Sequence, residues 1–486
     1  MCGGCVDAPN MKIGGRNGLA LAAAVTIALG AASAALGAPL SGPGHAHGAG
    51  HAKVCVHVER KVRRGLKASR SQKTDGSCKS RSPRHVRAKS TQGSSTVKAA
   101  PIVPATFATT VVSVKSATTT APVTAPKTAP VSTPLQAKPY AGRVGIAITH
   151  NVLDASVSQI EAQFAQIRAG GASWVRTDLS WATAEPQAGV FNWGPFDRLM
   201  SAASAAGVRV LGILDYSTPW ASSDPSGQGN EFYPPTNDGY FAAYGAAVAG
   251  RYGPGGLFWA ENPMLTPDPL TAVEIWNEPY GSWYWKPAPS PTAYAALVRQ
   301  TAPAIHGVDP TMQVLMSGNV LDGTQQPWLA QVLAAQPSVA GLVNGLAVHP
   351  YPIVRSSGPY ATTSTIDESF GQISVVHQTE LAAGVPLPIW ITEIGWSTAP
   401  DTPTAVSPQL QATYLTGAVE RTVTEWGSYV SKIFLYGWLR STGTPGDWDG
   451  NLGLLDPNGA LTPAWQQLTQ LLGGVPGAAD TSSALG

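Results

Sequence analysis

The stretch VEIWNEPYG, Val273 to Gly281, places an amide and a carboxyl directly after a run of strand-forming residues. Val273, Ile275 and Trp276 favour a buried strand, and Pro279 cannot extend a central strand. Asn277 and Glu278 therefore stand where a strand ends, which is where α/β folds hold their catalytic side chains. The alternative is a helix cap or turn, because Asn and acids before Pro often initiate turns.

From Tyr140 onward, segments typical of strands alternate with segments typical of helices. We expect strands at 143–149, 173–179, 208–216, 272–278, 313–319, 345–351, 388–396 and 432–438. We expect helices at 155–169, 196–206, 240–251 and 292–306, and near Trp328, Ile373, Leu415 and Trp465. Eight strand-then-helix units predict a single (β/α)₈ TIM barrel over residues 139–474. A doubly wound sheet is the alternative, but no Gly-rich phosphate fingerprint follows the first strand.

The first 38 residues have the pattern of an export signal. Lys12 and Arg16 precede an apolar run, Leu19 to Ala38, that contains an A-x-A-like cleavage site. The run is also long enough for an uncleaved membrane anchor, and translation could start at Met11. We therefore expect a secreted or cell-surface protein, with disordered segments at residues 39–138 and 475–486.

Charge is divided sharply along the chain. Up to Lys138, 19 Lys and Arg residues stand against three Asp and Glu, a net charge of +16. The rest carries 12 basic and 26 acidic residues, a net charge of −14. The basic segment leads into a Ser/Thr/Pro/Ala-rich spacer, and together they could attach the protein to anionic cell-envelope polymers. A solvated disordered run is the alternative, and nucleic acid is disfavoured because the chain is expected outside the cytoplasm.

The positions of the four cysteines exclude thiol chemistry in the expected barrel. Cys2 and Cys5 precede the export signal, and Cys55 and Cys78 could form a disulfide in an oxidising compartment. No Cys follows Cys78, so the expected barrel contains none.

Two acids close expected strands that lie far apart in the sequence. Glu278 ends the fourth strand, and Glu393, in PIWITEIGWS, ends the seventh. A barrel brings these strand ends to one mouth, and paired carboxylates suit the cleavage of glycosidic bonds. A metal site is the alternative, but His349 is the one plausible imidazole ligand nearby and no H-E-x-x-H spacing occurs. Other polar or aromatic residues at expected strand ends are Arg176, Asp178, Asp215, Tyr216, His349, Tyr351 and Trp438.

Several of these motifs resemble one clan of enzymes. WNEP (276–279) and ITEIGWS (391–397) resemble the acid/base and nucleophile motifs of retaining (β/α)₈ glycoside hydrolases. The stretches VRTDLSWATAEPQAGVFNW (175–193), ILDYSTPW (213–220) and LAVHPY (346–351) resemble members of families 39 and 5. Asp215 and Tyr216 stand where many family 5 members carry a His, which favours family 39-like relatives. The resemblance spans about residues 144–472 and does not identify the sugar.

The resemblance implies a role for each matching residue. Glu278 is the expected general acid/base, with a pKa raised by burial, and Glu393 is the expected nucleophile. Asn277 is expected to bond the sugar 2-hydroxyl, and Arg176 to keep the nucleophile ionised. The other expected substrate contacts are Tyr351, which orients the nucleophile, His349, and Trp438 as a stacking platform. No metal and no cofactor are implied.

These features predict a retaining glycosidase that acts on oligo- or polysaccharides outside the cytoplasm. Its two carboxyl groups should lie about 5 to 5.5 Å apart. A non-catalytic carbohydrate-binding barrel is the alternative function. Six further aromatic residues could form sugar-stacking subsites, about half of them being expected to pack instead, and many such subsites would favour endo action. They are Trp220, Trp283, Tyr284, Trp285, Trp396 and Trp448.

Overall fold

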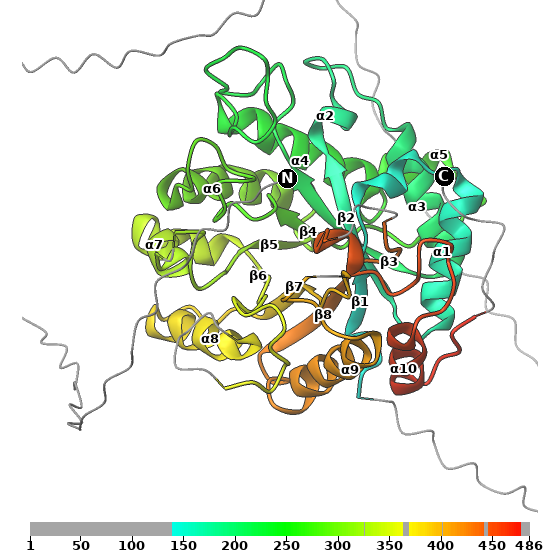
Figure 1. The fold of residues 1–486 in the computed structure, drawn as a ribbon. Coiled ribbons are helices and arrows are strands. Elements are labelled where there is room, and N and C mark those ends of the chain that lie inside the picture. Colours follow the sequence, from blue (N-terminus) through cyan, green and yellow to red (C-terminus); the bar gives the residue numbers. More distant parts are fainter. Residues whose placement is uncertain (1–138, 325, 363–368, 401, 442–445, 478–486) are drawn as a thin grey trace, which may run out of the picture. The chain divides into compact units, whose positions relative to one another are not determined.

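A computed structural model describes residues 139–477, apart from residues 325, 363–368, 401 and 442–445 (Figure 1). Eight parallel strands form a closed barrel in sequence order, with β1 paired to both β2 and β8. The expected (β/α)₈ barrel is confirmed. The strands are β1 Val144–Ala147, β2 Trp174–Ser180, β3 Arg209–Asp215, β4 Ala272–Ile275, β5 Gln313–Ser317, β6 Gly345–Val348, β7 Ile389–Ile394 and β8 Val430–Tyr436.

Helices surround the barrel and follow the strands in turn (Figure 1). All the helices expected from the sequence are present, and two short ones, α2 and α5, were not expected. The α-helices are α1 Val157–Ala169, α2 Trp181–Ala184, α3 Gly194–Ala206, α4 Asp238–Tyr252, α5 Leu257–Glu261, α6 Pro291–Val308, α7 Trp328–Ala335, α8 Ile373–Ala382, α9 Pro408–Thr424 and α10 Pro463–Leu472. Short 3₁₀ helices lie at η1 His150–Asp154, η2 Pro337–Leu342, η3 Phe370–Gln372 and η4 Asp449–Asn451.

Within the described part of the chain, no helix has both the length and the apolar character needed to cross a bilayer. The expected signal segment and the basic spacer lie outside the described residues, as does most of the expected C-terminal tail.

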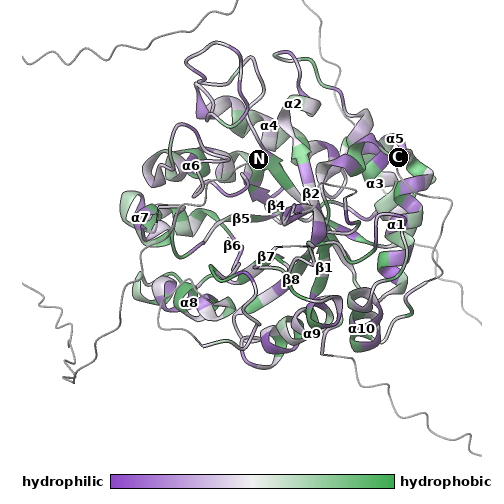
Figure 2. Ribbon diagram, in the orientation of Figure 1, coloured by the Kyte–Doolittle hydropathy of each residue, from purple (hydrophilic) through white to green (hydrophobic). Residues whose placement is uncertain are grey.

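One layer of the barrel interior is filled by large aromatic side chains opposite small ones. The Trp174 ring meets Trp390 edge-to-face with centroids 5.6 Å apart, and Trp390 stacks on Phe434 at 6.4 Å. Ala147, Ala272, Ala347 and Leu315 complete this buried cluster with Leu211. This packed layer plugs the barrel. Among the mostly hydrophobic strands, Figure 2 shows hydrophilic colour on parts of β2 and β4, the strands that carry Arg176 and Glu274.

Strand β4 ends earlier than expected, at Ile275 instead of residue 278. Its ladder with β3 stops at the pair Leu214–Ile275, and Trp276 and Glu278 then adopt positive φ angles of 63° and 46°. L-residues other than Gly rarely adopt this left-handed conformation, so the backbone is strained here. The turn directs successive side chains of the WNEP motif away from strand alternation.

Candidate active site

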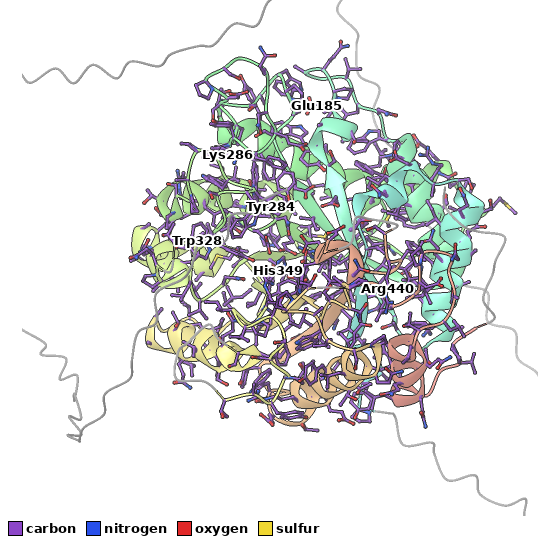
Figure 3. All side chains as sticks on the ribbon, viewed as in Figure 1. Glu185, Tyr284, Lys286, Trp328, His349 and Arg440 are labelled. Atoms are coloured by element: carbon purple, nitrogen blue, oxygen red, sulfur yellow. The ribbon has the colours of Figure 1, made fainter. Side chains whose placement is uncertain are left out.

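The carboxyl ends of the strands open into a cavity of about 1130 Å³. Figure 3 shows His349 near the centre of the barrel, with Tyr284 above it and Trp328 to its left beside α7. Six of the seven expected site residues line the cavity: Arg176, Asn277, Glu278, His349, Tyr351 and Glu393. Trp438 does not line it.

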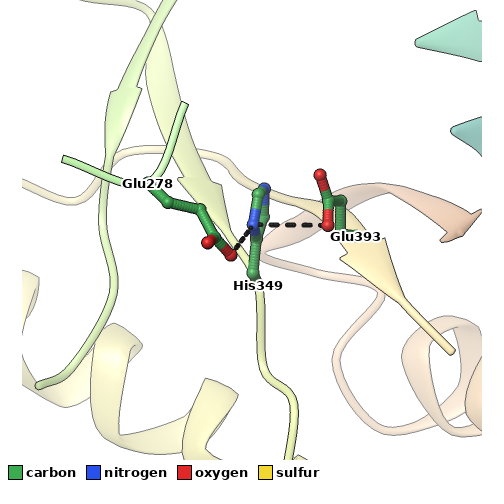
Figure 4. A group of neighbouring side chains, drawn as sticks. All are labelled: Glu278, His349 and Glu393. Atoms are coloured by element: carbon green, nitrogen blue, oxygen red, sulfur yellow. Dashed lines mark hydrogen bonds and ion pairs between the residues drawn. The ribbon is translucent and has the colours of Figure 1, made fainter. Parts of the chain in front are cut away.

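Glu278 and Glu393 face each other across His349 (Figure 4). One oxygen of each carboxyl and one ring nitrogen of His349 all lie within 4.8 Å of one another. His349 Nδ1 is 2.9 Å from Glu278 Oε1 and 3.7 Å from Glu393 Oε2. Two acids from strands far apart in the sequence are thus close neighbours, as the strand-end positions predicted.

Arg176 is the buried centre of the site, with its side chain 2% exposed. Its Nη1 donates to Glu393 Oε1 at 2.6 Å, and its Nε donates to Glu274 Oε2 at 2.8 Å. Its Nη2 donates to Asn277 Oδ1 at 2.9 Å and lies 3.3 Å from His349 Nε2. Burying a guanidinium is costly unless it is paired and hydrogen-bonded, and these contacts satisfy it. The pairing with Glu393 fits a role in keeping that carboxyl ionised.

Glu274 is a site residue that the sequence analysis missed. It lies inside β4 and is 2% exposed, so the AVEI strand carries an acid within the barrel. Its partner is Arg176, and its other oxygen lies 3.9 Å from His349 Nε2. The available signal was an ionisable residue in the middle of an otherwise apolar strand, which requires a buried partner of opposite charge.

His349 is held in one tautomer. An arginine can only donate, so the contact with Arg176 requires His349 Nε2 to accept, and the proton then lies on Nδ1, which donates to Glu278. The backbone is fixed by Asn319, whose Oδ1 accepts from the His349 N–H at 3.0 Å. Burial and Arg176 lower the pKa of His349, whereas Glu393 and Glu278 raise it more, so the pKa is raised overall.

Glu278 accepts three hydrogen bonds. Its Oε1 accepts from the Tyr280 hydroxyl at 2.7 Å and from His349 Nδ1, and its Oε2 accepts from Trp283 Nε1 at 2.6 Å. Burial by itself raises the pKa of this carboxyl, but these three hydrogen bonds and the electrostatic effect of His349 outweigh burial and lower the pKa to about 2. The expected raised pKa of the acid/base residue is therefore not found in this structure, because hydrogen bonding to the carboxylate outweighs burial.

Glu393 has the opposite balance. Burial and the nearby Glu278 raise its pKa, while His349 and Arg176 oppose the rise. The Tyr351 hydroxyl donates to Glu393 Oε2 at 3.2 Å, as expected of a residue that orients this carboxyl. Both oxygens of Glu393 are thus held, one by Arg176 and the other by Tyr351.

Asn277 is also fixed on both sides. Its Oδ1 accepts from Arg176, and its Nδ2 donates to the Tyr216 hydroxyl at 3.0 Å. Asn277 thus belongs to the buried network at the cavity floor. Tyr216 in turn stacks on Tyr284, with ring centroids 5.3 Å apart.

Asp215 lies at the end of β3, where many family 5 relatives carry a His. It is 1% exposed, and neither of its carboxyl oxygens accepts a hydrogen bond from any donor among the described residues. Burial and the neighbouring Asp178 raise the pKa of Asp215 well above its ordinary value. Because two adjacent carboxylates repel each other, a proton on Asp215 can be shared with Asp178. Both residues line the cavity.

The role predicted for Trp438 is wrong. The resemblance implied a sugar-stacking platform, but the residue is 2% exposed and packs edge-to-face on Trp465 of α10 with centroids 5.0 Å apart. The reason lies in Gly437, whose φ of 92° breaks the strand alternation directly after β8. Tyr436, the last residue of β8, lines the cavity instead.

The expected aromatic subsites divide as anticipated, about half in the cavity and half in the core. Trp283, Tyr284 and Trp448 line the cavity, and Trp283 is 48% exposed. Trp285 and Trp396 are buried in the core. Trp220 lies outside the cavity lining, and its indole donates to the Glu185 carbonyl at 2.9 Å.

Glu278, His349 and Glu393 could also reach a single cation. A divalent ion would there face the Arg176 guanidinium, which already lies 2.6 Å from Glu393 Oε1. It would also have to displace the donors on Glu278. The donor set therefore fits an arginine-paired acid dyad better than a metal centre.

The solved structures show the same architecture. A family 39 glycoside hydrolase from Bacteroides cellulosilyticus WH2 aligns with a TM-score of 0.50 at 20% identity over 68% of this chain. A family 5, subfamily 18 enzyme from Streptomyces cattleya, in complex with GlcNAc, aligns with a TM-score of 0.51 at 17% identity, covering 69% of this chain and 80% of that one. The fold is that of glycoside hydrolase barrels.

A related enzyme of subfamily 18, from Bifidobacterium longum subsp. infantis, aligns with a TM-score of 0.51 at 15% identity, covering 68% of this chain and 78% of that one. This chain spans 63% of the Bacteroides enzyme, so a third of that relative has no counterpart in the barrel described here. A family model described as beta-galactosidase, glycoside hydrolase family 42, matches residues 153–221. No curated protein sequence matches the chain. The barrel is thus related in fold to those of families 39 and 5.

Proposed function

We propose that this protein is a retaining glycoside hydrolase that cleaves O-glycosidic bonds in oligo- or polysaccharides by double displacement. The observation that carries the proposal is the pair Glu278 and Glu393, one oxygen of each lying within 4.8 Å of one oxygen of the other. Inverting enzymes hold their carboxyl groups about 6.5 to 9.5 Å apart to admit a water, and retaining enzymes about 5 to 5.5 Å apart. The close approach supports the retaining chemistry.

The contacts of the two acids support different roles. Glu393, ion-paired with Arg176 and oriented by Tyr351, suits attack on the anomeric carbon as a carboxylate. Glu278, whose side chain is 15% exposed against 11% for Glu393, suits protonation of the departing oxygen and later deprotonation of the incoming water. Asn277 suits binding of the sugar 2-hydroxyl, because Arg176 and Tyr216 fix its amide at the cavity floor.

The size and lining of the cavity support a substrate of more than one sugar. Stacked Tyr216 and Tyr284 lie on one side, and Trp448 packs against Tyr351 on another, with centroids 5.8 Å apart. Aromatic rings suit the apolar faces of sugars. GlcNAc is bound by the Streptomyces relative, which supports a pyranose ligand for this cavity without identifying it.

A non-catalytic carbohydrate-binding barrel is the weaker candidate. Such a protein needs no paired acids, whereas here both acids, the arginine and the tyrosine are held in one network. A binding surface gains nothing from burying these charges.

Activity and stereochemistry can be measured together. We expect the full chain to hydrolyse at least one member of a panel of aryl β-glycosides and soluble polysaccharides. Proton NMR during the reaction should show the β-anomer of the product first. The Glu393→Gln variant is the control, because it removes the nucleophile and changes few atoms. Initial appearance of the α-anomer would contradict the retaining mechanism, and no turnover at all would favour the binding barrel.

We also propose that the protein acts outside the cytoplasm, with the basic segment before residue 139 holding it at the cell surface. The charge division of +16 against −14 supports this. A chain that starts at Pro139 should keep kcat and KM on soluble substrates and lose salt-sensitive retention on cells, since such adhesion is screened beyond about 8 Å at physiological ionic strength. Retention of the shortened chain would place the adhesive surface on the barrel.

A further inference from the structure

Trp283 donates a hydrogen bond to the proposed acid/base residue and so favours its carboxylate form. A general acid must carry a proton and present it to the glycosidic oxygen. Glu278 Oε1 is occupied by Tyr280 and His349, and Oε2 is occupied by the Trp283 indole at 2.6 Å. The indole N–H occupies one acceptor position of Oε2, and a donor on that oxygen favours the carboxylate over the protonated acid.

The three partners of Glu278 differ in one respect. A tyrosine hydroxyl can accept as well as donate, whereas an indole N–H is a donor only. His349 also donates only from Nδ1 while Arg176 occupies its Nε2, so Tyr280 alone of the three can reverse its hydrogen bond when Glu278 is protonated. The contact with Trp283 therefore always favours the carboxylate form of Glu278.

Trp283 is also the most exposed of the three partners. Its side chain is 48% exposed, whereas Tyr280 and His349 are buried. It lies in the segment between β4 and α6, and its ring passes over two glycines. A Cβ on Gly281 would come within 2.1 Å of the ring, and one on Gly323 within 3.1 Å. The ring thus packs on bare backbone at both glycines, and no side chain of either covers it.

We propose that Trp283 is a latch on Glu278: its indole N–H occupies the oxygen that must meet the leaving group, and a sugar entering the cleft displaces it. Displacement removes a donor from the Glu278 carboxylate, which raises the affinity of the carboxyl for the proton, taken from solvent, that the first step needs. This inference rests on the proposed function. Trp283 is a positioning residue, because it acts through Glu278.

Other charged groups also act on Glu278 and stay in place when Trp283 moves. Four effects outweigh burial and lower the pKa of Glu278 to about 2, and the Trp283 hydrogen bond is one of them. The titratable groups that act on Glu278 are His349 and Tyr351 from the end of β6, Glu393 from β7, Tyr280 and Tyr284 from its own segment, and Asp449 from η4. Arg176 from β2 contacts His349, which in turn contacts Glu278. Replacing Trp283 should change only the contribution of its own hydrogen bond to the pKa of Glu278.

The Trp283→Phe variant tests the latch, since Phe keeps an aromatic ring and removes the donor. In the pH profile of kcat/KM, the basic limb reports the pKa of the acid in the free enzyme. In the pH profile of kcat, the basic limb reports the pKa of the acid in the enzyme–substrate complex. Losing the donor raises the pKa of Glu278, so the kcat/KM limb should move to higher pH by about one unit. The kcat limb should stay, because the bound sugar has already displaced the indole. A phenyl β-glycoside is the substrate, since its poor leaving group needs the acid.

Trp448→Phe is the matched control. Trp448 also lines the cavity, but its Nε1 has no hydrogen-bond partner among the described residues. Whatever this variant does to KM, it should leave both limbs in place. An unmoved kcat/KM limb in Trp283→Phe, or an equal shift in Trp448→Phe, would overturn the latch.

A second measurement needs no turnover. In ¹H–¹⁵N spectra of the whole chain, the Trp283 indole signal is the one that is missing from the spectrum of Trp283→Phe. This signal should shift in Glu278→Gln and keep its position in Glu393→Gln. Adding the phenyl β-glycoside to Glu393→Gln should move the signal as well, as the sugar displaces the indole. An indole signal that keeps its position in Glu278→Gln would overturn the hydrogen bond. A signal that keeps its position when the glycoside is added would overturn the displacement. Absence of turnover in the wild type would instead overturn the proposed function.

Discussion

Replacing Glu393 by Ala should reduce kcat on every substrate by on the order of 10⁵-fold or more, because no covalent intermediate can form without the carboxylate. Activated and unactivated leaving groups should suffer alike, since the lost bond is the one to the anomeric carbon. Initial rates on a dinitrophenyl glycoside and on an unactivated oligosaccharide measure this directly.

The fold should survive this change. Arg176 keeps its buried ion pair with Glu274 and its hydrogen bond to Asn277 when the Glu393 carboxyl is removed. An unchanged far-UV circular dichroism spectrum would separate lost chemistry from lost structure. A folded Glu393→Ala variant that retains a tenth of the wild-type rate would show that Glu393 is not the nucleophile.

Replacing Glu278 by Ala should produce a selective defect. Hydrolysis of substrates with poor leaving groups should fall by about 10²- to 10⁴-fold, because these leaving groups need the proton. Glycosylation by a dinitrophenyl glycoside should be nearly unchanged, because that leaving group departs without one. The covalent intermediate should then accumulate, since no base activates the water.

Azide supplies the missing step, because it is a strong nucleophile that needs no base. Adding it to Glu278→Ala should raise kcat on the dinitrophenyl glycoside and yield a β-glycosyl azide, which NMR identifies. The same addition to Glu393→Ala should not yield the β-azide. Identical behaviour of the two variants would show that the two roles are assigned wrongly.

The sequence predicted the barrel because each strand is a short apolar run bounded by turn residues, and because parallel strands place their carboxyl ends together. That reasoning alone paired Glu278 with Glu393 across a long separation in sequence. That reasoning failed at Trp438, because the positive φ of Gly437 reverses the side-chain direction after β8. Glycine adopts positive and negative φ about equally readily, so the sequence does not show which of them a given glycine has.

The residues behind the site were harder to predict. Glu274 and Asn319 act on Arg176 and His349 through contacts between strands, which no local pattern encodes. The bond from Trp283 to Glu278 depends on the path of a loop. The resemblance therefore supplied the residues expected to touch the sugar, and the structure supplied the residues that hold them.

The left-handed backbone at Trp276 and Glu278 has an evolutionary consequence. Each such residue costs about 1 to 3 kcal/mol of folding stability. Natural selection for a durable fold alone would place Gly or Asn at both positions, because these tolerate positive φ. The chain instead keeps a buried tryptophan at one and an acid at the other. Directed evolution for thermostability would therefore tend to erase this motif unless each round also selected for turnover.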